Sequence, residues 1–174
     1  MKLQAFAVLA AALALASCND TIIPVCPSAA VLSDTSNLTV FRAGAPADPS
    51  GEAYTAAISN VQQSCSYKKG AAFSVSKLSF TVRAIRAPSP DGAEYVLPYF
   101  LTISQGDRLL SKKSLRMVLK FPPGSAAASM DESQDDITVN LEPGHPPTDY
   151  QLLVGFQLSD AERAYNQKRG RYTP

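Results

Sequence analysis

Hydrophobic and polar residues alternate along much of this chain, and the clearest alternation lies between Leu78 and Ala84. Four apolar residues share one parity there and three polar residues share the other: Leu78, Phe80, Val82 and Ala84 against Ser79, Thr81 and Arg83. Consecutive side chains of a strand point to opposite faces, so this segment predicts a half-buried β-strand. Phe73 and Val75 have the opposite parity, which predicts a bulge near Ser76 and Lys77.

Comparable apolar segments recur along the chain and are separated by clusters of turn-forming residues. They lie at 28–32, 38–41, 54–58 with a continuation to Cys65, 73–84, 95–103, 115–121, 137–141 and 150–158. Pro98 interrupts one of them and favours a bulge or an edge position at that point. Residues 124–136 are small, polar and acidic, and we expect a flexible connection there.

This pattern predicts an all-β fold, an antiparallel β-sandwich of seven or eight strands with a small barrel as the alternative. We favour an immunoglobulin-like sandwich. The chain has no Trp, so the Cys…Trp…Cys spacing of antibody domains is absent and the expected likeness is one of architecture.

A short C-terminal helix is the one departure from strands. Ser159 and Glu162 have the spacing of a capping box, which predicts a helix from Asp160 to about Lys168. Gly170 is suited to end it, and Lys168 and Arg169 complement the dipole at its C-terminus.

The first eighteen residues carry a targeting signal. Lys2 precedes an apolar run from Leu3 to Ala16 that is interrupted only by Gln4, and small residues precede Cys18. This is the pattern of a secretory signal peptide, and the run is shorter than the roughly 20 residues that span a bilayer. We therefore divide the chain into a cleaved signal (1–17), a tether (18–25), a β-sandwich (26–158) and a helix with a basic tail (159–174).

Leu15-Ala16-Ser17-Cys18 resembles the lipobox of bacterial lipoproteins. The resemblance implies that the Cys18 sulfur carries a diacylglyceryl group and that the protein is anchored in the bacterial envelope, facing the periplasm. Asn19 lacks the charge of the Asp that typically retains such proteins in the inner membrane, so the outer membrane is favoured. Further segments resemble a family of uncharacterised bacterial envelope lipoproteins that lends no catalytic residue: Cys26-Pro27, Ser64 to Tyr67, Val154 to Leu158 and Ala161 to Asn166.

With Cys18 assigned to lipid, Cys26 and Cys65 remain, and the expected compartment permits disulfides. We predict that they pair. In the chain-entropy model, closing a loop of about 39 residues stabilises the fold by roughly 4 kcal/mol before any strain is subtracted. The alternative is two separate buried thiols.

Composition and candidate chemistry both argue against catalysis. The formal net charge is +1, without the basic excess of a nucleic-acid-binding protein. His145 is the only histidine and lies in a proline-rich turn, so we expect no metal site, no Ser-His-Asp triad and no cofactor. The acidic residues 131–136 lack the spacing of a calcium loop, and we interpret them as a solvated segment.

Two basic groups are candidates for binding. One consists of Lys112, Lys113, Arg116 and Lys120, and the other, beside Tyr165, consists of Arg163, Lys168 and Arg169 with Arg171. Either could contact anionic headgroups, and either could equally be a solvated face that protects an edge strand. Tyr165 and Tyr172 add aromatic contact area beside the second group. We expect a partner protein to dock on this C-terminal segment, through Arg163, Tyr165, Lys168 and Arg169.

The sequence thus favours a membrane-anchored periplasmic lipoprotein, not an enzyme, that acts as a structural or assembly partner of an envelope complex. Its expected partners are the lipid bilayer, through acylated Cys18, and an envelope protein. The alternative is a ligand-binding module that uses loops 44–51, 88–92 and 142–149 at the end of the sandwich.

Overall fold

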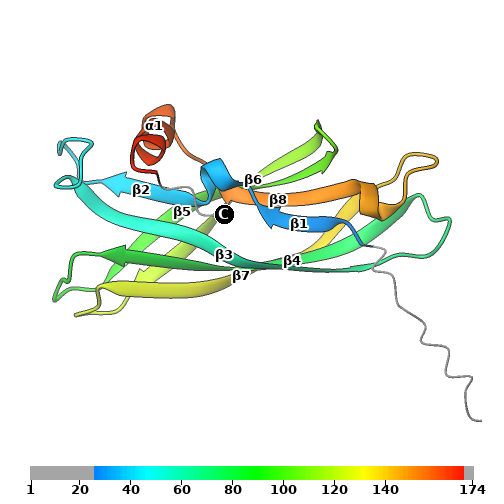
Figure 1. The fold of residues 1–174 in the computed structure, drawn as a ribbon. Helices are drawn as coiled ribbons and strands as arrows, with labels where there is room; N and C mark the ends of the chain where they lie inside the picture. Colours follow the sequence, from blue (N-terminus) through cyan, green and yellow to red (C-terminus); the bar gives the residue numbers. More distant parts are fainter. Residues whose placement is uncertain (1–25, 171–174) are drawn as a thin grey trace, which may run out of the picture.

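The computed structural model describes residues 26–170, which form two four-stranded sheets packed face to face (Figure 1). Cys18 and the predicted tether, like Arg171 in the tail, lie outside the described residues. In chain order the elements are β1 (Ser28–Val31), η1 (Ser33–Thr35), β2 (Asn37–Phe41), β3 (Glu52–Ser66), β4 (Phe73–Arg86), β5 (Ala93–Gln105), β6 (Arg108–Phe121), β7 (Ala127–Asn140), η2 (Pro147–Asp149), β8 (Tyr150–Phe156) and α1 (Asp160–Lys168).

The strand order is β1-β8-β5-β6 in one sheet and β2-β3-β4-β7 in the other. Neighbouring strands are antiparallel except for the parallel pair of β1 and β8. This confirms the all-β sandwich with a short C-terminal helix. The immunoglobulin-like part of the prediction is not confirmed, because the last two strands of an immunoglobulin domain share one sheet, whereas β7 and β8 lie in different sheets.

The core lies between the two sheets and consists of the inward-facing residues of both. The alternation of apolar and polar residues along β4 accounts for its share of the core, because its four apolar residues on one parity are all buried: Leu78, Phe80, Val82 and Ala84. They pack against inward residues of β5 and β8, of which Tyr99, Tyr150 and Phe156 are the largest. Burial of this apolar area is the main term that favours the folded chain.

The bulge predicted in β4 near Ser76 and Lys77 is wrong. Strand β4 alternates without a break, so buried Ser74 and Ser76 continue the inward face and Phe73 points outward, 50% exposed. The register of β4 and β7 does shift between Ser76 and Leu78, but the extra residue belongs to β7.

Pro98 lies just beyond the last β5 residue paired with β8, where only the backbone nitrogen of Gln157 reaches its carbonyl. The missing N–H of Pro98 therefore leaves only the reciprocal bond to Gln157 unmade, beyond the end of β8, and the β5/β8 ladder itself is intact.

Strand β7 corrects the prediction of a flexible connection over residues 124–136. It pairs with β4 along almost its whole length, interrupted by one register shift. Its apolar signal is weak because Glu132 and Gln134 occupy inward positions, near the side of the sandwich that is not covered. Polar side chains there still reach hydrogen-bond partners, so the strand forms without an apolar stripe.

The disulfide between Cys26 and Cys65 confirms the predicted pairing and joins the two sheets. Cys26 precedes β1 of one sheet and Cys65 belongs to β3 of the other. Loops 67–72 and 141–149 lie at this same end of the molecule, which we call the Cys26 end (Figure 1). Loops 42–51, 87–92 and 122–126 lie at the opposite end, the far end.

The helix begins at Asp160 and ends at Lys168, as predicted, and its N-terminus carries the complete capping box of Ser159 and Glu162. It covers the outer edge of β2. The Asn166 amide donates to the Asn37 carbonyl at 2.8 Å, and its oxygen accepts from the Thr39 hydroxyl at 3.1 Å. Side-chain hydrogen bonds thus replace the next strand at this edge.

The short helix η1 crosses from one sheet to the other beside β8. A β-carbon on Gly155 would lie 2.0 Å from the Thr35 hydroxyl oxygen and 2.9 Å from the Phe100 ring. Glycine at this position therefore allows η1 and Phe100 to pack directly on β8. The disulfide, η1 and α1 together close the β1/β2 side of the sandwich (Figure 1). On the opposite side, no strand or helix within residues 26–170 covers the edges of β6 and β7.

Candidate functional site

The hairpin of β5 and β6 concentrates the exposed apolar side chains of the described residues. Val96 and Val118 face each other across the two strands and are 57% and 44% exposed. Leu109 and Leu110 lie near the hairpin tip and are also exposed. These four are the majority of the seven large exposed hydrophobic residues in this part of the chain. They form two pairs, the facing valines and the leucines near the tip, about 26 Å apart along the strands.

The same hairpin carries a high density of positive charge. Strand β6 contains five cations and no acidic residue: Arg108, Lys112, Lys113, Arg116 and Lys120. We define the hairpin surface as these five cations together with Val96, Val118, Leu109 and Leu110. It combines apolar and cationic groups, as a binding face for an acidic partner would.

Contacts within the hairpin orient several of these cations. The Lys120 ammonium lies 2.7 Å from Glu94, and the Lys112 ammonium lies 4.4 Å from the centre of the Phe100 ring. Arg108 pairs with Glu142 in the loop before β8. Within residues 26–170, neither Lys113 nor Arg116 forms an ion pair, so both charges are available to another molecule.

The local sequence explains why this surface is exposed. Met117, Leu119 and Phe121 in the second half of β6 are buried in the core. The first half, from Arg108 to Ser114, is exposed on both faces. Because β6 is the edge strand of its sheet, one row of its backbone N–H and C=O groups also has no neighbouring strand in the described part of the chain.

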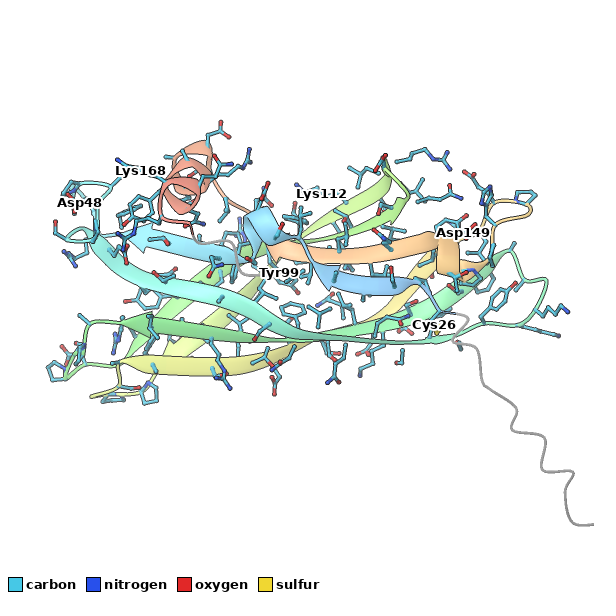
Figure 2. The ribbon with its side chains drawn as sticks, in the orientation of Figure 1. Cys26, Asp48, Tyr99, Lys112, Asp149 and Lys168 are labelled. Atoms are coloured by element: carbon cyan, nitrogen blue, oxygen red, sulfur yellow. A yellow bond between two sulfur atoms is a disulfide. The ribbon has the colours of Figure 1, made fainter. Side chains whose placement is uncertain are left out.

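A buried polar group lies directly behind the β6/β7 side. The Tyr99 hydroxyl donates to Glu132 at 3.0 Å and accepts from the Gln134 amide at 2.9 Å. Burial of the ring, with the adjacent Glu132 as a second cause, raises the pKa of Tyr99 far above its ordinary value. The phenol therefore stays protonated and serves as a structural donor between the sheets (Figure 2).

The C-terminal group predicted to bind a partner is divided by the structure. Tyr165 is only 7% exposed, its hydroxyl donates to Glu52 at 2.6 Å, and its ring packs edge-on against Phe41. The helix therefore uses this ring to dock on its own domain, which leaves little of the ring for contact with a partner. Arg163 lies 3.6 Å from Asp160 of the same helix, whereas Lys168 and Arg169 are exposed.

The candidate catalytic and metal-binding groups do not converge. His145 pairs with Asp149 at 2.8 Å on the surface of the Cys26 end. On β7, Asp131 accepts from Thr81 and Asp135 pairs with Lys77. Within residues 26–170, no three His, Cys, Asp or Glu side chains group as metal ligands would.

The three loops of the ligand-binding alternative do not form one site. Loops 44–51 and 88–92 lie at the far end, whereas loop 142–149 lies at the Cys26 end, as Asp48 and Asp149 mark in Figure 2. A shallow hollow of about 360 Å³ lies instead over the β3 bulge, between Asn60, Thr81 and Asp131. Its polar groups bond one another, since Thr81 accepts from Asn60 and donates to Asp131.

Comparisons with family models, with curated proteins and with solved structures find no match to this chain. No helix within residues 26–170 is both long and apolar enough to cross a membrane.

The sequence alone indicates most of the cations of β6. It does not indicate their joining with Val96 and Val118, because only the pairing of β5 with β6 places the two valines opposite each other.

Proposed function

We propose that this chain is a lipid-anchored, non-enzymatic domain of the bacterial envelope that binds another envelope protein through the hairpin surface. Acylated Cys18 holds it in the membrane, with the outer membrane favoured, and the folded domain faces the periplasm. It uses no cofactor. The hairpin surface takes the place of the C-terminal segment as the docking site, because Tyr165 is occupied within the domain.

The observation that carries this proposal is the grouping of exposed valines and leucines with five cations on one hairpin. Exposed apolar area supplies affinity, and surrounding charge selects the partner and accelerates encounter. The partner therefore presents an apolar patch with an acidic rim. Ligand binding has less support, because its three expected loops lie at opposite ends of the sandwich.

Two features support the location. The lipobox-like Leu15-Ala16-Ser17-Cys18 supplies the anchor, and a disulfide between Cys26 and Cys65 suits an oxidising compartment. Only seven residues separate Cys18 from Cys26. Fully extended they reach about 25 Å, so the Cys26 end lies close to the bilayer.

Site-specific photocrosslinking in intact cells tests the docking surface. A photoreactive amino acid at Val118 should capture one defined envelope protein. The same group at Ser64, which is exposed on β3 of the other sheet and away from the β6 and β7 edges, serves as the matched control and should not capture it. Equal capture at both positions, or no adduct other than the chain itself at Val118, would contradict the proposal.

Labelling with a palmitate analogue tests the anchor separately. The intact chain should incorporate the label and fractionate with the outer membrane. A Cys18→Ala variant should lose the label, whereas a Cys26→Ala variant should retain it. Label that survives loss of Cys18 would contradict the anchoring step.

A further inference from the structure

The two uncovered edges of the sandwich carry opposite charges. Strand β6 has five cations and no acid, and β7 has four acids and no cation: Asp131, Glu132, Asp135 and Asp136. Both strands have 14 residues, and each is the edge of its sheet on the same side of the molecule. The opposite side is closed by the disulfide, η1 and α1.

Side-chain contacts across the core show which residues of the two edges lie at the same height. Tyr99 pairs with Leu115 of β6, and its hydroxyl reaches Glu132 of β7. Leu115 is therefore level with Glu132. One residue further toward the far end, Arg116 of β6 is level with Asp131 of β7. Three residues from the first pair toward the Cys26 end, Lys112 of β6 is level with Asp135 of β7.

The four charged residues also point to the outside of their sheets. Arg116 and Lys112 alternate with the inward-facing Leu115 and Met117, and Lys112 lies over Phe100. Asp131 lies beside Thr81 and Asp135 beside Lys77, on the outer face of β4. Directly opposed residues of antiparallel strands point to the same face.

We propose that a second copy of this chain docks on the β6/β7 side, related by a two-fold axis parallel to the strands. Rotation about this axis places β6 of each copy beside β7 of the other, antiparallel, in both layers of the sandwich. Arg116 then lies opposite Asp131 of the second copy, and Lys112 opposite Asp135. Each pair occurs twice, as the symmetry of an isologous interface requires.

Other pairings of the same edges are less favourable. Two β6 edges would oppose cations to cations, and two β7 edges would oppose acids to acids. Such antiparallel self-pairing also requires an axis perpendicular to the strands, which sends the two Cys26 ends in opposite directions. The parallel axis keeps both Cys26 ends on one side, so both tethers can enter the same membrane. In that respect the inference rests on the proposed anchor.

Lysines on an edge strand often serve only to prevent pairing. In this protein the β7 edge carries the complementary acids. The cations of β6 therefore disfavour pairing with unrelated strands and favour pairing with β7 of another copy. The pairs are exposed to solvent and therefore sensitive to ionic strength. We expect the dimer dissociation constant to rise at least about tenfold between 0.05 and 0.5 M salt, since each tenfold change needs only about 1.4 kcal/mol.

Charge reversal gives a reciprocal test on the full chain purified in detergent, with mass measured by light scattering after gel filtration. The first variant combines Lys112→Glu with Arg116→Glu, and the second combines Asp131→Lys with Asp135→Lys. Each should be monomeric alone, because it opposes like charges. A mixture of the two should form a mixed dimer, because both layers then pair opposite charges. Lys68→Glu with Lys69→Glu, an equal charge change in a loop at the Cys26 end, should remain dimeric.

Thermal unfolding of each variant separates lost pairing from lost folding, since an intact melting transition shows a folded chain. A wild-type chain that is monomeric at about 100 µM, well above a µM dissociation constant, overturns the inference. So does a mixture of folded variants that stays monomeric. A monomeric chain that still captures a different protein at Val118 retains the proposed function and loses only this dimer.

Discussion

The Tyr99 hydroxyl lies 3.0 Å from the Glu132 carboxylate and joins β5 of one sheet to β7 of the other. Tyr99 is only 1% exposed, so its hydroxyl depends on this contact and on Gln134 for hydrogen bonding. The pair sets the relative height of the two edge strands. It therefore links the stability of the core to the arrangement of charge on the β6/β7 side.

Replacing Tyr99→Phe should lower the free energy of unfolding by about 1–3 kcal/mol, because a part-buried carboxylate loses a donor. Urea unfolding followed by circular dichroism measures the change. Tyr95→Phe is the matched control, since no hydrogen bond from the Tyr95 hydroxyl occurs within residues 26–170, and it should shift stability by less than about 0.5 kcal/mol. Equal losses for both variants would contradict the role given to the Tyr99 hydroxyl.

Burial of Tyr54 also makes the stability of the fold depend on pH in the alkaline range. Desolvation, with Tyr95 and Glu162 as further causes, raises the pKa of Tyr54 to about 12 from an ordinary value of 10.0. Above pH 10 the unfolded chain releases this proton and the folded chain retains it, so stability should fall as pH rises from 10 to 12, by up to about 2 kcal/mol. Tyr54→Phe removes this titration and should flatten the decline in urea midpoints. An unchanged slope in that variant would exclude Tyr54 as its source.

The Cys26–Cys65 disulfide closes a sequence separation of 39 residues and joins the sheets at one end. Replacing both with Ser should cost about 4 kcal/mol in the chain-entropy model. The urea midpoint of the double variant should equal that of the reduced wild type. A reduced wild type as stable as the oxidised protein would contradict a stabilising role.

Gly155 shows how much of the packing depends on one missing methyl group. A β-carbon there would lie within 3 Å of both Thr35 and Phe100, so Gly155→Ala should destabilise the fold by more than about 2 kcal/mol. Gly144→Ala is a control of a different kind, because a β-carbon there meets no atom and only its positive φ of 85° opposes the change. That variant should cost about 1 kcal/mol, and a Gly155→Ala variant equally mild would show that η1 can move away.

Alternation and capping signals were sufficient for most of the fold. The sequence predicted the two-layer class, the helix from Asp160 and the disulfide. It wrongly placed a bulge in β4, because it expected Phe73 to be in the core and Phe73 is 50% exposed. It missed β7, because Glu132 and Gln134 occupy positions that periodicity expects to be apolar. Their partners come from Tyr99 of another sheet, and no local pattern reveals such a contact.

The hairpin surface was only half predictable for the same reason. Four of the cations on β6 stand close together in sequence and were identified as a group. Val96 lies 22 residues before Val118, and only the register of β5 and β6 brings them together. Likewise, Tyr165 has the composition of a binding residue, and its buried contact with Glu52 depends on a strand 113 residues earlier.

The two valines of the hairpin surface should separate binding from folding. Val96→Thr with Val118→Thr keeps two β-branched, strand-favouring residues at exposed positions and removes apolar contact area. Stability should change by less than about 1 kcal/mol, because neither side chain is in the core. Capture of the envelope partner by a photoreactive group at the neighbouring Arg116 should nevertheless fall by about tenfold, since two buried methyl groups are lost at about 0.8 kcal/mol each and tenfold corresponds to about 1.4 kcal/mol. The control, Ile85→Thr on the other sheet, makes the same kind of change at a residue that is 65% exposed and should leave capture unchanged. Undiminished capture by the double valine variant, with its urea midpoint intact, would show that the partner binds elsewhere.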